Sequence, residues 1–299
     1  MLERGVVVSN GKGGVGKTTV AAHLAGVAAA SGWRVLLVDL DPQGNLGQDL
    51  GYLQEGRSDD GRGLHSAVLT GTPVTPLREV RPGLDVVPAG EMTDELIEVL
   101  ARRQAKHRGA VRDLEGALAP LAAEYQLVVL DCPPGDKVML DAALTAAHFV
   151  LIPTRADDGS IKGLERVARR FAALRVEDNP GLELLGVVLF DFGAGDKRIL
   201  AETRSELAEA LDETAPVFGG VIRHARKAAR DMRRSGLLAF EYGRAAAASP
   251  PWYERGRDVE APTFAGNADD LAGDYQKLAA EILSCFSERL AKEAQAVAR

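Results

Sequence analysis

A glycine-rich segment near the start of the chain has the residue types and the spacing of a phosphate-binding loop. Glycines let the backbone curl so that several N–H groups point at phosphate oxygens, and a helix that begins at the loop adds its partial positive charge. In such a loop the lysine reaches the β and γ phosphates and the following threonine hydroxyl holds Mg²⁺. Here these residues are Lys17 and Thr18. The nucleotide-binding residues predicted are Gly11, Lys12, Gly13, Gly14, Val15, Gly16, Lys17, Thr18 and Thr19.

The surroundings of this segment argue against the alternative of a plain glycine-rich turn. The strand-like run Val6–Val8 precedes the loop, and helical spacing follows it as far as Gly32. A loop between a strand and a helix is the context that the motif requires. We therefore predict a nucleotide site at this position.

Three aspartates stand at the ends of strand-like apolar runs, where the ligand sites of α/β sheets lie. Asp39 and Asp41 close the run that begins at Val35, and the two-residue period of a strand puts both on one side. Asp131 follows the run Leu127–Leu130. A buried strand that ends in a carboxylate can present it to Mg²⁺, usually through water, because a hard cation prefers oxygen ligands. For Asp41, a turn ahead of a proline is the alternative.

Short apolar runs alternate with segments of helical spacing, which predicts an α/β fold with a doubly wound, mostly parallel sheet and helices on both faces. We expect a single domain over residues 1–299, with loops at 54–63 and 243–267, the second as an insertion. The predicted strands are Val6–Val8, Val35–Leu40, Leu84–Val87, Leu127–Leu130, Val150–Pro153 and Leu184–Phe190. The predicted helices lie near 17–31, 93–122 with a break near Lys106, 138–147, 159–174, 197–212, 223–234 and 269–296.

The composition suits one large domain in a reducing compartment. Hydrophobic residues make up 46% of the chain, enough for a well-buried core, and the net charge of −7 leaves room for only a local basic patch. The two cysteines, Cys132 and Cys285, are too few for a disulfide framework and too far apart for a metal knuckle. No apolar run has the length or flanks of a signal peptide or membrane span, so we expect a cytoplasmic protein.

Two of these motifs resemble segments of a known family. Residues Lys12–Thr19 resemble the deviant phosphate loop of the ParA/MinD family, also called the SIMIBI class. Residues Asp39–Asn45 resemble its Asp-x-Asp-Pro-Gln-Gly-Asn segment. The resemblance covers about residues 4–240 and 270–290, including the segments Leu84–Ala89, Asp141–Ala147, Val150–Thr154 and Gly186–Leu189.

The resemblance implies ATP as the nucleotide and a dimer in which two subunits sandwich two ATP molecules. In this family the early lysine crosses the dimer interface, so Lys12 would stabilise charge on the phosphoryl group bound by the other subunit. A solvated surface lysine is the alternative. The second aspartate of the family segment orients or activates the attacking water, which assigns Lys12 and Asp41 as the catalytic residues. Asp39 would assist Lys17 and the Mg²⁺ water shell, and the metal-site residues implied are Thr18, Asp39 and Asp131.

The adenine contacts cannot be carried over from the family. Its adenine-contacting loop should lie near the strand around Val217–Ile222, but the Pro-Arg that often follows is replaced here by Arg223 and His224. We therefore leave these contacts unassigned.

Two branches of the family need features that can be sought in the sequence. Members that hold iron–sulfur clusters need paired cysteines, and Cys132 with Cys285 supplies no such pattern. Membrane-cycling members similar to MinD need a C-terminal amphipathic helix with cationic flanks. Here the apolar residues from Tyr275 to Leu290 have helical spacing and indicate a helix docked on the core. We expect no stable membrane association, and a MinD-like cycle stays an alternative.

A cationic segment late in the chain indicates a partner. Between residues 223 and 234 six cations are opposed by one acid, and on a helix they would lie on one face. Such a stripe contacts phosphates and gives salt-sensitive, sequence-independent DNA binding. A solvated helix face is the alternative. The predicted DNA-binding residues are Arg223, Arg226, Lys227, Arg230, Arg233 and Arg234, with Lys197 and Arg198 as an extension.

The resemblance and the cationic stripe together imply a ParA-like partition ATPase. ATP would drive a homodimer onto nonspecific nucleoid DNA, and hydrolysis stimulated by a ParB-like DNA-binding protein or cargo adaptor would release it. Hydrolysis by one subunit should be slow, because one subunit does not supply every charge that the transition state needs. The alternatives are an ATPase that positions a microcompartment, a flagellum or a chemosensory cluster, and a nucleotide-dependent binding module that scarcely hydrolyses. Whether the cargo is a plasmid or a chromosome stays open.

Overall fold

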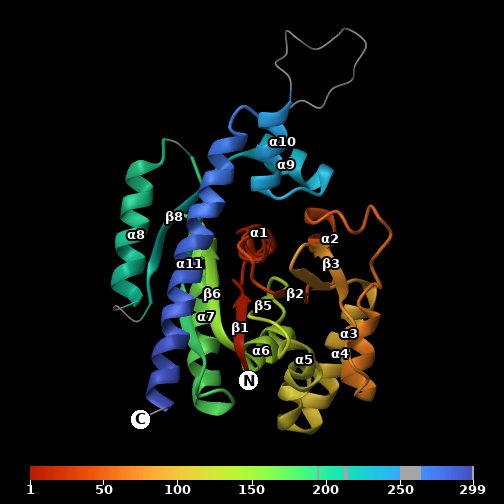
Figure 1. Cartoon of the computed structure of the whole chain (residues 1–299). Helices are drawn as coiled ribbons and strands as arrows, with labels where there is room; N and C mark the ends of the chain where they lie inside the picture. The colour runs from red at the N-terminus through yellow and green to blue at the C-terminus, as the bar shows by residue number, and fades with distance from the viewer. Residues whose placement is uncertain (194, 212–214, 250–263, 298–299) are drawn as a thin grey trace.

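The described part of the chain contains an eight-stranded sheet of order β3-β4-β2-β5-β1-β6-β7-β8 (Figure 1). This computed structural model describes residues 1–193, 195–211, 215–249 and 264–297. All neighbouring strands are parallel except β3 and β4. The strands are β1 Leu2–Val8, β2 Val35–Asp39, β3 Leu77–Arg81, β4 Leu84–Val87, β5 Leu127–Asp131, β6 Ala147–Thr154, β7 Glu183–Phe192 and β8 Val217–Arg223.

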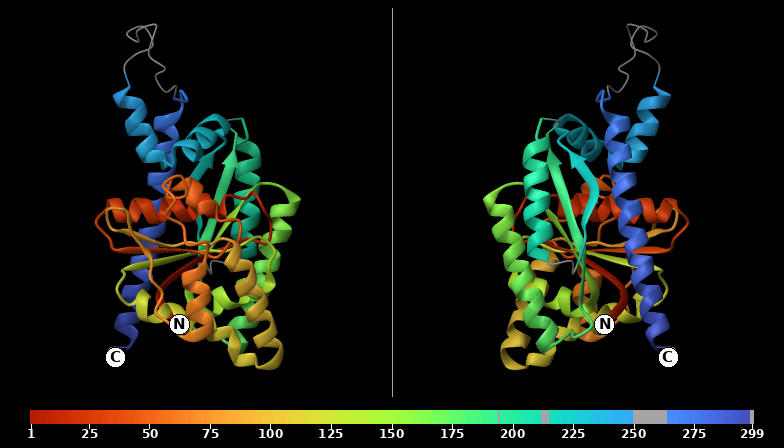
Figure 2. Two further views of the ribbon diagram at one scale, coloured as in Figure 1. Left: turned by 90° about the vertical axis from the view of Figure 1, so that its right-hand side faces the viewer. Right: turned by 90° about the vertical axis from the view of Figure 1, so that its left-hand side faces the viewer.

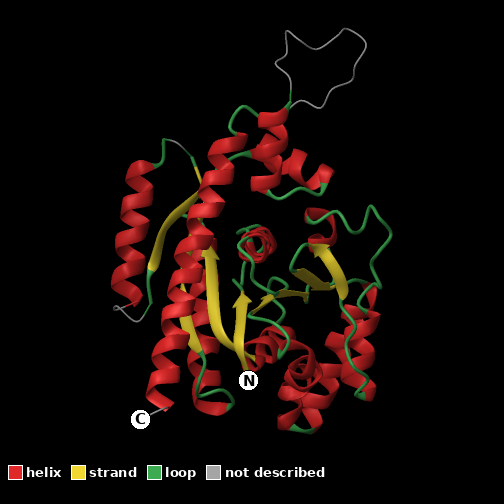
Figure 3. Ribbon diagram, in the orientation of Figure 1, coloured by secondary structure: helices red, strands yellow, loops and turns green. Residues whose placement is uncertain are grey.

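Helices cover both faces of the sheet, as the side views show with α1 and α11 on one side and α7 and α8 on the other (Figure 2). The first face carries α1 Lys17–Ala30, α2 Asn45–Asp49, α9 Arg226–Ser235, α10 Ala239–Ala248 and α11 Ala268–Val297. The second face carries α3 Arg62–Thr70, α4 Glu91–Lys106, the 3₁₀ helix η1 Arg108–Arg112, α5 Asp113–Ala122, α6 Lys137–Ala146, α7 Asp158–Glu177 and α8 Lys197–Leu211. The predicted fold class is thereby confirmed (Figure 3).

Alternate residues of the central strands belong to two different cores. In β1, Val6 and Val8 pack into the core beneath α1 and α11, whereas Val7 packs into the core on the other face. In β2, Leu37 and Val38 divide in the same way. Because both faces are covered, almost every residue of these strands must be apolar. This is why the strands could be recognised in the sequence as continuous apolar runs, and all the predicted strands are confirmed.

Four elements were not predicted: β3, α2, α3 and α10. β3 is a polar edge strand, and α2 and α3 are short. The predicted loop at 243–267 is wrong for residues 243–248, which complete α10, while residues 250–263 lie outside the described residues. Long-range contacts hold α10, since the Tyr242 hydroxyl accepts a hydrogen bond from the N–H of Ala265 at 2.7 Å. Contacts of this kind leave no periodic pattern in the sequence.

The final helix, α11, packs on the sheet along its apolar face. Tyr275, Leu278, Ile282 and Phe286 are all buried there. The predicted docked helix is therefore confirmed. Within the described ranges, no helix combines the length and the apolar character needed to span a bilayer.

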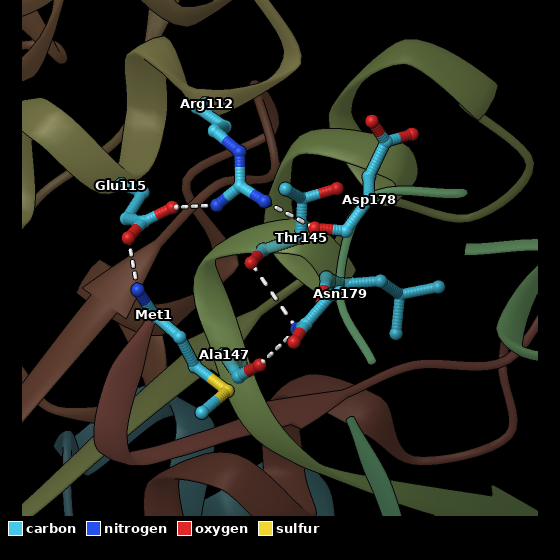
Figure 4. A network of polar contacts seen from close by, with 8 residues as sticks. Met1, Arg112, Glu115, Thr145, Ala147, Asp178 and Asn179 are labelled. Carbon is cyan, nitrogen blue, oxygen red and sulfur yellow. Dashed lines mark hydrogen bonds and ion pairs between the residues drawn. The ribbon is translucent and has the colours of Figure 1, made fainter. Parts of the chain in front are cut away.

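A polar network ties the amino ends of the strands together, opposite the phosphate loop (Figure 4). The buried Asn179 contributes three of its hydrogen bonds. The Nδ2 of Asn179 donates to the carbonyls of Leu144, Thr145 and Ala147 at 2.9, 3.2 and 2.7 Å. Arg112 bonds Glu115 at 3.0 Å and also the carbonyl of Asp178, and Glu115 pairs with the amino group of Met1. The network holds the connections at the amino ends of the strands. The candidate site lies at the opposite, carboxyl edge of the sheet.

Candidate nucleotide site

The predicted phosphate loop joins β1 to α1 and has the backbone conformation that its glycines allow. Gly14 and Gly16 have φ angles of 75° and 86°, in the left-handed region that other residues avoid. Gly16 also needs to lack a side chain, because a Cβ there would lie 2.5 Å from the ring of Phe190. The loop is anchored at Val15, which is fully buried. The segment predicted from the sequence is therefore shaped by the positions of its glycines.

Asn10, which the sequence analysis did not single out, supports the loop from beneath. It is fully buried, and its Nδ2 donates to the carbonyl of Pro153 at 2.8 Å. Its Oδ1 accepts from the N–H of Lys12 at 3.0 Å. Asn10 thus links the loop to the end of β6.

Lys17 lies inside the loop, with only 6% of its surface exposed. Its Nζ donates to the carbonyl of Lys12 at 2.9 Å, so the ammonium is held where phosphate oxygens would enter. Burial lowers the pKa of Lys17, and the nearby Asp131 and other anionic groups oppose this shift. A cation in this position can bind the β and γ phosphates.

Asp39 and Asp131 lie side by side at the carboxyl edge of the sheet, because they are register partners in β2 and β5. Both are fully buried. Within the described residues, neither oxygen of Asp131 and only one oxygen of Asp39 has a hydrogen-bond partner; that oxygen accepts from the N–H of Asp41 at 3.0 Å. Buried carboxylate oxygens without partners fit Mg²⁺ with its water shell. Thr18 lies next to Asp131 and can supply the hydroxyl ligand.

The donor set favours a cation that keeps water and phosphate ligands. In the described ranges, no three side chains of His, Cys, Asp or Glu form a cage for a metal ion. Mg²⁺ is bound in this way, through one or two carboxylates together with substrate phosphates. Cys132, beside Asp131, is buried with a raised pKa, as expected of a packing residue.

Burial raises the pKa of both carboxyl groups. Burial raises the pKa of Asp131 to about 7, and Thr18 and Lys17 offset part of this effect. Burial, and then repulsion by Asp131, raises the pKa of Asp39 well above its ordinary value. Without a bound cation, ionisation of these two carboxyl groups therefore lowers the free energy of unfolding.

Asp131→Asn should stabilise the nucleotide-free protein at high pH. An aspartate in the unfolded chain titrates near 3.8, whereas folded Asp131 holds its proton up to about pH 7. Stability is therefore lost as the pH rises through this window, and the variant avoids the loss. Between pH 4 and pH 8, the free energy of unfolding of the variant minus that of the wild type should increase by on the order of 2–4 kcal/mol. Urea titrations without nucleotide or Mg²⁺ measure this difference.

The pH dependence of this difference distinguishes charge from packing. A buried amide left without partners adds a cost that does not vary with pH, and titration of the buried His23 is common to both proteins. Asp94→Asn, on the exposed face of α4, is the matched control and should show no such gain. A difference between Asp131→Asn and wild type that stays constant with pH would contradict the raised pKa.

Asp41 lies in the turn between β2 and α2 and is buried. Its Oδ1 accepts from the N–H of Gln43 at 3.0 Å, and its carbonyl accepts from Gly44 at 2.9 Å. The turn role that was the alternative reading is therefore present in the structure. Its role towards water stays a prediction.

Lys12 lies at the outer rim of the loop, with its side chain 38% exposed. Its ammonium is paired with Asp157, which follows β6 in the same chain. Lys12 therefore does not point at the phosphate position that Lys17 serves. Its predicted role in a second subunit remains compatible with this position at the rim.

A cavity of about 260 Å³ opens beside the loop, at the carboxyl ends of β7 and β8. It was not predicted, since the residues that line it are far apart in the sequence. Apolar side chains and a few polar groups suit a flat heterocycle. The lining includes Thr19, Phe190, Asp191, Ile222, His224, Arg226 and Tyr275.

A chain of polar contacts crosses the mouth of this cavity. Asp191 has a φ of 66°, which is uncommon outside glycine. It accepts from Nδ1 of His224 at 2.6 Å and pairs with Arg155. Arg155 in turn donates to the carbonyl of Gly14 at 3.3 Å. The phosphate loop is thereby joined to the end of β7.

The structure corrects the predicted cationic stripe at its first residue. Arg223 ends β8 and does not belong to a helix, because α9 begins at Arg226. Its guanidinium pairs with Asp270 and Asp274 of α11, which neutralise it. Arg223 is therefore a structural link between β8 and α11.

The other five cations predicted between residues 223 and 234 all lie on α9 and are exposed. Lys227 pairs with Asp231 on the same helix, and Arg233 pairs with Asp49 of α2. The other three cations form no ion pair with any residue that the structure describes; these are Arg226, Arg230 and Arg234.

Lys197 and Arg198 do not continue this stripe. They begin α8, whose apolar side chains pack into the core on the opposite face of the sheet from α9. Arg198 also pairs with Glu202. The expected extension therefore belongs to a different helix, packed on the other face of the sheet, and its part in DNA binding stays a prediction.

Comparison with known proteins places this site in a family. Residues 3–184 match the family described as "AAA domain". Chromosome-partitioning ATPase Soj of Thermus thermophilus is 37% identical over 233 residues, 73% of this chain and 87% of that protein. Chromosome partitioning protein ParA of Myxococcus xanthus is 37% identical over 191 residues, 62% of this chain and 64% of that protein. The match thus spans slightly less than two thirds of the Myxococcus protein.

Solved structures agree with this assignment. A variant of McdA from Cyanothece in complex with ATP gives a TM-score of 0.74 at 19% identity, covering 95% of this chain and 96% of that one, a likeness of fold alone. Cobyrinic acid a,c-diamide synthase from Mycobacterium smegmatis, with an ATP analogue and magnesium, gives 0.67 at 26% identity over 94% of each chain. From the phosphate loop, the paired strand-end aspartates and these matches, the chain belongs to the ParA/MinD family of P-loop ATPases.

Proposed function

We propose that the protein is a ParA-like ATPase that dimerises around ATP, binds DNA without sequence preference and partitions a DNA cargo. The partition-type relatives and the geometry of the phosphate loop support the nucleotide part of this proposal. The exposed cations of α9 support the DNA part. A ParB-like protein or cargo adaptor would stimulate hydrolysis, and the ATP-bound dimer would be found on the nucleoid.

ATP would lie across the loop with its base in the cavity at the ends of β7 and β8. The ring of Phe190 touches the loop at Gly16 and can also contact the base. Arg155, Asp191 and His224 would close the mouth of the cavity on the ribose side of the phosphates. These residues are our assignment for the contacts that the sequence left open.

In the proposed reaction a water oxygen bonds to the γ phosphorus while the bond from that phosphorus to the bridging oxygen of ADP breaks. Lys17 holds the β and γ phosphates, and Asp41 orients the water and receives its proton. Bound Mg²⁺, held by Thr18 and through water by the strand-end aspartates, would neutralise charge on the phosphates. Lys12 of a second subunit would add the cation that the transition state still lacks.

The observation that carries the proposed function is the position of Arg226. It lines the nucleotide cavity and is also the first residue of the cationic helix α9. A single short element therefore borders both the cavity proposed for the nucleotide and the surface that would bind DNA. With this arrangement, the bound nucleotide would control whether that surface is accessible to DNA.

Replacing Arg226, Arg230 and Arg234 by glutamate should strongly weaken ATP-dependent DNA binding. These cations are exposed and unpaired among the described residues, so they can release counterions from DNA phosphates. We expect the affinity to fall on the order of 100-fold, and the slope of log affinity against log salt to decrease by up to about 3 per subunit. Gel shifts over a salt series, with ATP and with ADP, measure both quantities.

The control for this experiment carries the same change of charge on a distant surface. Arg102, Arg166 and Arg169 are exposed on α4 and α7, on the other face of the sheet. Their replacement by glutamate should leave the salt slope nearly unchanged. If the α9 variant kept the wild-type affinity and slope, the assignment of the DNA surface would be wrong.

A further inference from the structure

We propose that Asp49 is a positioning residue that couples the nucleotide site to α9 through its ion pair with Arg233. The proposal rests on DNA binding by α9 and concerns its regulation. Asp49 is the last residue of α2, and its Oδ1 accepts from Nε of Arg233 at 2.8 Å. The Asp49 side chain is 10% exposed, against 46% for Arg233. The pair therefore fixes a surface helix to a buried anchor.

The anchor is joined closely to the turn of Asp41. Only residues 42–44 separate Asp41 from α2, and the N–H of Gly44 bonds the Asp41 carbonyl at 2.9 Å. The N–H of Gly47 then bonds the carbonyl of Gly44 at 3.0 Å, so turn and helix form one unit. Leu46 packs this unit into the core. A shift of Asp41 towards a bound γ phosphate would consequently displace α2.

The segment after α2 holds the carboxyl end of α9 as well. Arg81 donates to the carbonyls of Leu50 at 3.2 Å and Gly236 at 2.7 Å, and it pairs with Glu241. Gly51 and Gly236 approach so closely that a Cβ on Gly236 would lie 2.4 Å from the Cα of Gly51. With no side chain between these two backbones, movement of one must displace the other.

Space is available for α9 to respond. A cavity of about 340 Å³ separates it from α1, between Thr19, Asp49 and Arg230. Beyond the carboxyl end of α9 the chain is fixed to α1, because the N–H of Ala239 donates to Nε2 of the buried His23 at 2.9 Å. The helix α9 is thus held at its carboxyl end and borders free volume on the side of α1. Two positions of α9, selected by α2, would present its cations differently.

Coupling between two binding sites is reciprocal. If ATP raises the affinity for DNA by some factor, DNA raises the affinity for ATP by the same factor. Breaking the link between α2 and α9 should bring both factors towards one and leave the binding of nucleotide alone unchanged. A residue that acted only on stability would not change these ratios.

The test is Asp49→Asn in the full chain, which keeps the shape of the side chain and removes its charge. In the wild type we expect DNA affinity with a non-hydrolysable ATP analogue to exceed that with ADP by about 10-fold or more. In the variant the ratio should fall to within about 2-fold, while affinity for the analogue without DNA stays within about 2-fold of wild type. Arg234→Gln is the control, because it should weaken DNA binding equally in both states and keep the ratio.

Arg233 supplies a conservative rescue and a second route if Asp49→Asn folds poorly. Arg233→Lys keeps the charge and should retain most of the ratio, whereas Arg233→Gln should lose it. Combining Asp49→Asn with Arg233→Gln should have no greater effect on the ratio than either change alone. A ratio that stays at the wild-type value in Asp49→Asn or in Arg233→Gln would overturn the proposal.

Hydrogen exchange separates failure of this proposal from failure of the proposed function. If the wild type bound DNA in neither nucleotide state, the proposed function would fail. The coupling would still be measurable, because amides of α9 should change their exchange when the ATP analogue binds to wild type and not to Asp49→Asn. An equal response in the two proteins would overturn the coupling.

Discussion

ATP-driven dimerisation should be lost in Lys12→Ala, and ATP turnover in the presence of DNA should fall by about 10³-fold or more. A cation delivered by a second subunit to the transferred phosphoryl group supplies rate enhancements of this size. Within one chain the ammonium of Lys12 pairs with Asp157 at the rim, whereas that of Lys17 lies inside the loop. Light scattering with an ATP analogue and phosphate release measure the two effects.

The same variant should still bind ATP as a monomer, since Lys17 and the loop glycines are unchanged. Lys17→Ala, by contrast, should lose nucleotide binding itself. Lys106→Ala, an exposed lysine at the end of α4, is the control and should match wild type in both assays. An intact, active dimer of Lys12→Ala would exclude a role for Lys12 across the interface and leave it a surface residue paired with Asp157.

Asp41→Asn should lower ATP turnover by about 10²- to 10⁴-fold and leave ATP binding and dimerisation intact. The expected range is that of a lost general base or water-orienting group. Asparagine retains an oxygen that can accept the N–H of Gln43, so the observed turn should persist. The substitution therefore removes the carboxylate chemistry without the structural role. Steady-state and single-turnover assays with DNA present measure the rate.

The control Asp94→Asn removes one carboxylate from the surface of α4 and should not change turnover. Equal rates for Asp41→Asn and wild type would restrict Asp41 to its turn. If the wild type itself hydrolysed ATP no faster than Asp41→Asn, with DNA and a partner present, a nucleotide-dependent binding module would describe the protein better than an ATPase.

The central fold could be predicted because both faces of the parallel sheet are covered. Strands such as β5 are then apolar up to their last residue, here Asp131, and this pattern is visible without any structure. The edge strand β3 and the helix α10 lacked such a signal, because a polar edge and long-range contacts such as that of Tyr242 with Ala265 produce no periodicity. The predicted start of the cationic helix at residue 223 was wrong for a similar reason. Arg223 has the charge of the stripe, but its partners are on α11.

The candidate site, like the fold, has parts that the sequence predicted and parts that it did not. The sequence by itself predicted the phosphate loop and the strand-end positions of Asp39 and Asp131, because these depend on glycine positions and on strand ends that neighbouring residues specify. Only the tertiary structure decided which residues surround the cavity at the ends of β7 and β8, and which cations of α9 form no ion pair with a described residue. It also brought Asp49 to Arg233, residues that lie far apart in the sequence. Local requirements of the backbone are specified by contiguous residues, whereas contacts between helices depend on how the helices pack on the whole sheet.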